Sequence, residues 1–99
     1  KEYNLIKAEN GEEGLKLLRK EKVDLIILDI MLPKMSGIEF LDKVRKYKKY
    51  DQVKILIFTI IRFTAKEEKD LLKRGAQGIL NKPLPIKDLQ RNIKAALKG

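Results

Sequence analysis

Short aliphatic runs alternate along this chain with segments in which apolar residues recur every three or four positions. The aliphatic runs have the length and composition of β-strands, and they occupy Asn4 to Ala8, Val23 to Asp29, Val53 to Thr59 and Gly78 to Asn81. Two of them contain LIIL and KILIF, which are apolar on both faces. Because such strands suit a parallel sheet covered by helices on each side, the pattern predicts an α/β domain with a parallel sheet of about four strands.

The segments between these runs carry helix signals. Three candidate N-caps have a glutamate three residues later, and these pairs are Asn10 with Glu13, Ser36 with Glu39, and Thr64 with Glu67. The helix after the second cap has an apolar stripe at Phe40, Leu41, Val44 and Tyr47. Gly75 is placed to end the third helix, and Pro85 to begin a fourth. The predicted order is strand then helix, four times over, with right-handed crossovers.

The composition narrows the chemistry. The 99 residues, 43% of them hydrophobic, suit one domain spanning residues 1–99. Cysteine and histidine are absent, which excludes disulfides, thiol nucleophiles, imidazole metal sites and histidine-dependent triads. The apolar runs are far shorter than the roughly 18 to 20 residues of a membrane helix, and the N-terminal residues lack the order of a signal peptide. We therefore expect a cytoplasmic protein without a membrane partner.

The net charge of +9 favours approach to anionic partners such as nucleic acid. However, lysines alternate with acids along the predicted helices, where they solvate the outer face and form i,i+4 pairs. The main lysine cluster surrounds Tyr47 and Tyr50 at a predicted helix end, where cations complement the helix dipole. Direct nucleic-acid binding is therefore not expected, and an anionic partner for this cluster stays open as the alternative. Abundant lysine and isoleucine without cysteine also suit a thermophilic source.

Polar side chains end three of the predicted strands. Asp29 ends the second, Thr59 the third, and Asn81 with Lys82 the fourth. The carboxyl ends of parallel strands meet at one edge of the sheet, which is where ligands bind in open α/β sheets. The sequence therefore predicts that a carboxylate, a hydroxyl and an ammonium converge at this edge.

The segments that carry these residues resemble a known family. LIILDIMLPKMSG, ILIFT and NKPL are similar, in order and spacing, to the three signatures of the receiver domain of two-component response regulators, of the chemotaxis-receiver type. The resemblance covers nearly the whole chain and implies a flavodoxin-like fold. It also implies a signalling domain, not an enzyme, that accepts a phosphoryl group from a histidine kinase or phosphotransfer protein and then changes its affinity for partners.

The resemblance also implies roles for single residues. Asp29 is the implied phosphoacceptor. Lys82, followed by a cis peptide to Pro83, and Thr59 are the implied ligands of the phosphoryl oxygens. The backbone carbonyl of Met31 is an implied Mg²⁺ ligand together with Asp29. Ile79 stands where receivers usually carry an aromatic residue.

The start of the chain departs from the family pattern. Receivers begin with a strand ending in an acidic pair that holds Mg²⁺, followed by a helix, and neither precedes Asn4 to Ala8. We therefore expect a receiver truncated at the N-terminus, with weak Mg²⁺ binding and impaired phosphotransfer. In the family the missing elements lie beside Val23 to Asp29 and beside the last helix. Unpaired backbone and apolar surface there favour a homo-oligomer, such as a dimer formed by strand pairing or domain swapping.

Three alternatives stay open. In the first, the chain is a truncated or engineered receiver-scaffold fragment that acts as an oligomerisation or interaction module with an impaired phosphorylation site. In the second, Thr64, which precedes a small residue as in the family, replaces Thr59 as the phosphoryl ligand; we prefer Thr59 because Thr64 lies beyond the strand. In the third, the chain is a hydrolase of the same fold class, which the lack of a second carboxylate near Asp29 disfavours.

Overall fold

The structure, a computed structural model, describes residues 10–30 and 36–98. Within these residues a parallel sheet has the strand order β1-β2-β3, formed by β1 (Leu25–Leu28), β2 (Lys54–Thr59) and β3 (Gly78–Asn81). The helices are α1 (Gly11–Lys20), α2 (Gly37–Arg45), α3 (Ala65–Lys73) and α4 (Ile86–Lys98), and a 3₁₀ helix, η1, covers Lys48–Tyr50. These elements confirm the predicted α/β class, and the strand predicted at Asn4 to Ala8 lies outside the described residues.

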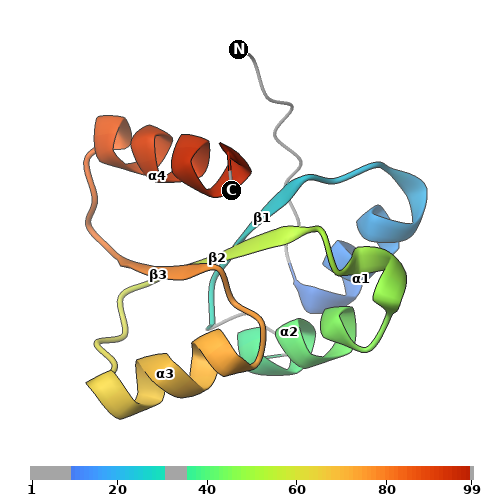
Figure 1. The fold of residues 1–99 in the computed structure, drawn as a ribbon, viewed down its shortest axis with the longest axis horizontal. Helices are drawn as coiled ribbons and strands as arrows, with labels where there is room; N and C mark the ends of the chain where they lie inside the picture. Colours follow the sequence, from blue (N-terminus) through green and yellow to red (C-terminus); the bar gives the residue numbers. More distant parts are fainter. Residues whose placement is uncertain (1–9, 31–35, 99) are drawn as a thin grey trace.

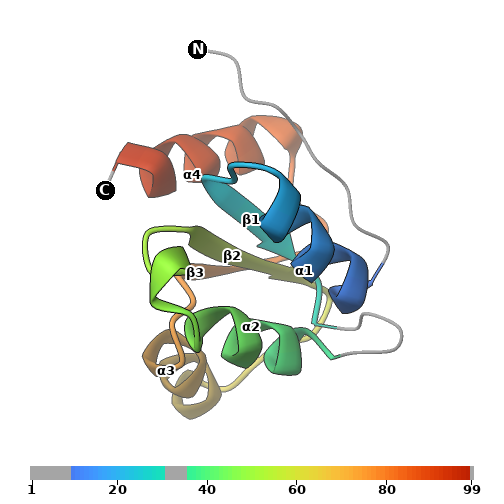
Figure 2. The same ribbon diagram turned by 90° about the vertical axis from the view of Figure 1, so that its right-hand side faces the viewer.

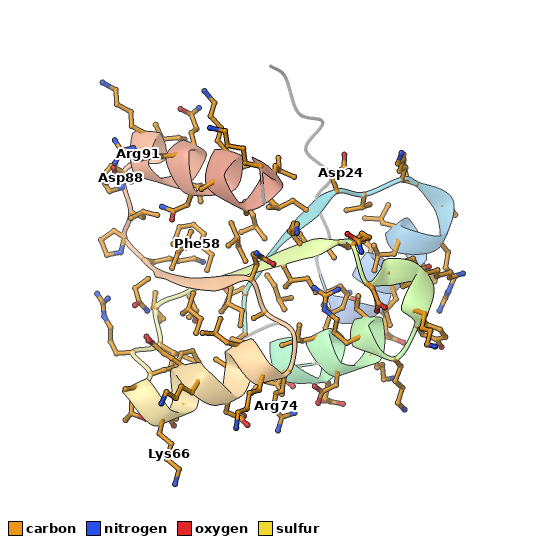
Figure 3. All side chains as sticks on the ribbon, in the orientation of Figure 1. Asp24, Phe58, Lys66, Arg74, Asp88 and Arg91 are labelled. Carbon is orange, nitrogen blue, oxygen red and sulfur yellow. The ribbon has the colours of Figure 1, made fainter. Side chains whose placement is uncertain are left out.

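Helices cover the sheet on both sides. α2 and α3 lie on one face, with α1 beside α2, and α4 lies on the other (Figure 1, Figure 2). Arg74 joins α2 to α3, because its guanidinium lies 2.7 Å from Asp42 and 2.9 Å from Asp70; Figure 3 labels it at the outer edge of this layer. No helix in the described part of the chain is long and apolar enough to cross a membrane.

The predicted helix starts are confirmed by side-chain caps. Asn10 accepts a hydrogen bond from the Glu13 N–H at 2.9 Å. Ser36 and Thr64 each form a complete capping box with the glutamate three residues later. Such caps satisfy N–H groups that have no partner within the helix.

The second helix is shorter than predicted. It ends at Arg45, and the chain turns into η1. Tyr47 therefore does not continue the apolar stripe; it is 53% exposed and meets the ring of Tyr50 edge-on at 6.0 Å. The i,i+3 spacing of Val44 and Tyr47 predicted a longer helix, but the path of the loop after Arg45 decides which way the Tyr47 ring points.

The core lies between β2 and the α2–α3 layer. Ile55 and Ile57 of β2 are completely buried against Leu41 and Val44 of α2. Burying aliphatic side chains of this size contributes roughly 1.5 to 3 kcal/mol each. Thr59, two positions beyond Ile57, continues this alternating row and is the one buried polar residue among those described.

The face under α4 is less completely covered. Ala96 is the one buried residue of α4, and Ile86 at its start is 71% exposed. On the strand beneath, Leu25 and Ile27 are only half-buried. Among the described strands, β1 pairs with β2 alone. Among the described residues, this face therefore retains apolar surface.

Arg45 binds several backbone carbonyls at the end of the domain opposite the carboxyl edge of the sheet. Its guanidinium donates to the carbonyls of Tyr50 (2.8 Å), Val53 (2.7 Å) and Gly75 (2.9 and 3.2 Å). Burial lowers the pKa of Arg45, and Asp51 partly opposes this. Gly75 has a φ of 114°, and a Cβ there would lie 2.7 Å from Nε of Arg45. The predicted glycine at the end of α3 is thus required both by its backbone angle and by the packed guanidinium.

Candidate functional site

Asp29 and Lys82 meet at the carboxyl edge of the sheet. Asp29 directly follows β1, and Lys82 directly follows β3. Lys82 Nζ lies 3.1 Å from Asp29 Oδ2, and the side chains of Lys82 and Asp29 are 37% and 38% exposed. An ion pair this accessible adds little stability. It leaves a carboxylate open to solvent with a cation fixed beside it.

Further contacts position Lys82. Its backbone N–H donates to the Thr59 carbonyl at 2.9 Å, and the peptide to Pro83 is cis, as expected. The ammonium also lies 5.3 Å from the ring centroid of Phe58, within the range of a cation–π contact. Phe58 lies between the sheet and α4 (Figure 3). Lys82 is therefore held through its backbone and its side chain.

Thr59 lies at the same edge but points inward. Its side chain is completely buried, and Oγ1 accepts a hydrogen bond from the Ile61 N–H at 3.2 Å. Thr64 has another role, because its hydroxyl accepts from the Glu67 N–H at 3.1 Å and caps α3. Among these two threonines, Thr59 is the one that ends a strand beside Asn81 and Lys82.

Gly37 brings the start of α2 against the backbone that follows β1. Its N–H donates to the Ile30 carbonyl at 2.9 Å. A Cβ at this position would lie 2.6 Å from Ile30 Cα and 2.9 Å from the Asp29 carbonyl oxygen. A side chain of any size would therefore displace the helix or the segment carrying Asp29.

The chain matches the family of response regulator receiver domains over residues 1–94. It belongs to this family. Two relatives illustrate this similarity. The receiver is 41% identical to the alkaline phosphatase synthesis transcriptional regulatory protein PhoP of Bacillus subtilis, over 97% of this chain and 39% of PhoP. It is 31% identical to protein PilH of Pseudomonas aeruginosa, over 98% of this chain and 79% of PilH. The chain thus spans well under half of one relative and most of the other.

Solved structures agree with this assignment. A signal receiver domain from Vibrio parahaemolyticus superposes with a TM-score of 0.87 at 28% identity, covering 97% of this chain and 72% of that one. The agreement confirms the flavodoxin-like receiver fold that the three sequence signatures implied.

The described residues of this receiver offer few metal ligands. No group of three or more Asp, Glu, His or Cys side chains among them is placed to hold a metal ion. Asp29 provides one carboxylate, with Lys82 bonded to it. Met31, the other expected ligand, lies outside the described residues. Mg²⁺ prefers six oxygen ligands, and the described residues supply one carboxylate towards them.

Two further residues of the receiver site were not assigned a role from the sequence. Phe58, which directly precedes Thr59 in β2, lies against the Lys82 ammonium. The Asn81 side chain donates to the carbonyls of Thr59 (3.3 Å) and Ile61 (2.7 Å). The position of Asn81 beside Lys82 was the one available signal, since nothing in its type specifies these acceptors.

Part of the predicted lysine cluster, Lys46 and Lys49, lines a hollow away from this edge. The hollow, of about 330 Å³, is lined by Leu15, Arg19, Lys43, Lys46, Tyr47, Lys49 and Tyr50. Arg19 and Lys43 lie in the last turns of α1 and α2, where cations complement the helix dipole. Lys49 also lies 5.2 Å from the Tyr50 ring centroid. Neither Asp29, Thr59 nor Lys82 lines this hollow.

Proposed function

We propose that this receiver accepts a phosphoryl group on Asp29 from a histidine kinase or phosphotransfer protein and then changes its affinity for partners. The observation that supports this most directly is the 3.1 Å contact between Lys82 Nζ and the accessible Asp29 carboxylate. It joins the expected nucleophile and the expected phosphoryl-binding cation from strands far apart in the sequence.

In the proposed step, an Asp29 oxygen attacks the phosphorus of a phosphohistidine. A P–O bond forms as the P–N bond breaks, and the donor ring nitrogen keeps the bonding electrons and takes a proton from solvent. Negative charge spreads over the phosphoryl oxygens, so a cation already in place stabilises the transition state. Lys82 serves this role, and it remains beside the phosphoryl group after transfer.

Thr59 is proposed as the second phosphoryl ligand and as the switch. Its hydroxyl is buried and bonded to the Ile61 N–H. We infer that contact with a phosphoryl group on Asp29 draws the hydroxyl away from this position. Such a movement would convert the added charge into a change of shape at the end of β2.

Magnesium is proposed as a weakly bound partner of this site. Asp29 would supply a carboxylate and Met31 a backbone carbonyl. When bound, the ion would neutralise part of the phosphoryl charge. Lys82 orients the Asp29 carboxylate. Gly37 lets α2 pack closely on the Asp29 backbone.

A second candidate function is an interaction module. The half-buried Leu25 and Ile27 of β1 and the exposed Ile86 favour association through the α4 face. We propose that the domain forms a homo-oligomer, with a dimer as the simplest form. This association is compatible with phosphorylation at Asp29, which lies at the carboxyl end of the sheet.

Intact-mass measurement after incubation with a small phosphodonor and Mg²⁺ tests the phosphoacceptor function. We expect the wild-type chain and Asp24→Asn to gain the mass of one phosphoryl group, and Asp29→Asn to gain none. Asp24 is a matched control because it is an exposed aspartate just before β1 (Figure 3). No gain by the wild-type chain, beside a second receiver that is phosphorylated under the same conditions, would leave the interaction module.

A further inference from the structure

Asn81 bridges the ends of two strands with one side-chain amide. It lies directly opposite Thr59 in the β2–β3 register. Its Nδ2 lies 2.7 Å from the Ile61 carbonyl oxygen and 3.3 Å from that of Thr59. An amide nitrogen carries two N–H groups, so both contacts can be made at once. The half-buried position of Asn81 limits competition from water.

The same short turn is held from within by Thr59. Its hydroxyl accepts the Ile61 N–H, two residues ahead, which is a recurrent local side-chain contact that fixes a turn. The Ile61 side chain packs partly buried against the core, while Ile60 between them is 64% exposed. Ile61 is therefore anchored through its N–H, its carbonyl and its side chain, and two of these anchors depend on Thr59 and Asn81.

We propose that Asn81 is a positioning residue that latches the Thr59–Ile61 turn to the end of β3 and so keeps the Thr59 hydroxyl in its inward position. The inference rests on the proposed function, in which this hydroxyl binds the phosphoryl group on Asp29. While the latch is closed, the Ile61 N–H stays in place to hold the hydroxyl. The state in which the Thr59 hydroxyl can reach the phosphoryl group is then a minor population. The apparent affinity for a phosphoryl group is reduced in proportion to that population.

Hydrogen exchange at the Ile61 amide, measured by NMR without any phosphodonor, tests the latch. Asn81→Leu keeps the side-chain volume but removes both donors. We expect Ile61 exchange to quicken by about tenfold or more, from the loss of two hydrogen bonds. Asn92→Leu is the matched control, because Asn92 makes one side-chain bond to the Asp88 carbonyl at 2.8 Å, within α4; it should leave Ile61 exchange unchanged. Asn81→Ser, which is too short to bridge both carbonyls, is the second variant and should show the same effect.

Binding of beryllofluoride with Mg²⁺, a mimic of the phosphoryl group, gives a readout that a purely structural role would not improve. Asn81→Leu should bind it several-fold more tightly than the wild-type chain, because the latch no longer opposes the competent state. Unchanged Ile61 exchange in both variants overturns the latch, as does weaker beryllofluoride binding by Asn81→Leu. If the wild-type chain binds no beryllofluoride and gains no phosphoryl group, the proposed function fails, whereas the Ile61 result still decides whether Asn81 holds the turn.

Discussion

The Lys82 ammonium and the Asp29 carboxylate, 53 positions apart in the chain, lie 3.1 Å from each other at the carboxyl edge of the sheet. Both side chains remain more than one-third exposed. The pair therefore adds little to the stability of the fold, which fits the phosphoacceptor role proposed for Asp29.

Replacing Lys82 should reduce the rate of phosphoryl acceptance while changing the free energy of unfolding little. We expect Lys82→Met to reduce the rate of phosphoryl acceptance by about 10- to 100-fold, because the transition-state charge loses its nearest cation. The free energy of unfolding should change by less than about 1 kcal/mol. Intact-mass time courses and urea unfolding measure the two effects, with the exposed Lys87→Met as control. Phosphorylation of Lys82→Met at the wild-type rate would refute the role given to this lysine.

The two threonines should have distinct effects. Thr64→Ala removes the cap of α3 and should lower the free energy of unfolding by about 1 kcal/mol, with no effect on the lifetime of the acyl phosphate. Thr59→Val leaves the Ile61 N–H without its acceptor, which costs about 1 to 3 kcal/mol, and should change that lifetime. Loss of phosphoprotein, followed by mass after the donor is removed, measures the lifetime. A changed lifetime in Thr64→Ala alone would support the alternative assignment of the switch residue.

Local signals explain why much of the fold and the central pair could be predicted. Helix caps depend on residues three apart, and parallel strands share an edge, so Asp29 and Lys82 were expected to meet. Asn81 was not assigned a role because its acceptors depend on strand register and on the path of the loop after β2. Tyr47 was placed wrongly for a similar reason, since helical spacing continues past the point where the chain turns. Such features are fixed by packing between distant segments.

Removing the Arg45 guanidinium should destabilise the domain. Arg45→Met retains much of the buried stem but leaves three partly buried carbonyls without this donor. We expect the free energy of unfolding to fall by about 2 to 4 kcal/mol. Arg91→Met is the control, because Arg91 makes an exposed pair with Asp88 at 3.2 Å and should change stability by less than about 0.5 kcal/mol. Equal effects of the two substitutions in urea unfolding would contradict this assignment.

Gly37 should be sensitive because of the close approach of α2 to the site. Gly37→Ala places a methyl group against the backbone of Ile30 and Asp29, and we expect a loss of about 1 to 3 kcal/mol together with slower phosphorylation. At Gly78 the nearest atom to an added Cβ is a Leu56 side-chain carbon at 3.3 Å, which can move. Gly78→Ala should therefore cost less and leave the phosphorylation rate closer to that of the wild-type chain. The reverse order would show that α2 does not constrain Asp29.

Solution size tests the proposed association through α4. We expect the wild-type chain to sediment as a dimer at micromolar concentration and Ile86→Lys to shift it towards the monomer, because a charge is placed on an exposed apolar position of this face. Lys87→Ala, which removes a neighbouring charge, should not dissociate it. A folded wild-type monomer across this concentration range would exclude a stable homo-oligomer.

The contacts of Arg45 also bear on how this region can evolve. All four of its hydrogen bonds end on main-chain oxygens, which every amino acid carries. Positions 50 and 53 can therefore accept many side chains without breaking these bonds, whereas position 75 is confined to glycine by its backbone angle and by the adjacent guanidinium. Among natural variants the arginine should be inherited together with the glycine, and correlated substitutions should not reveal its other two partners.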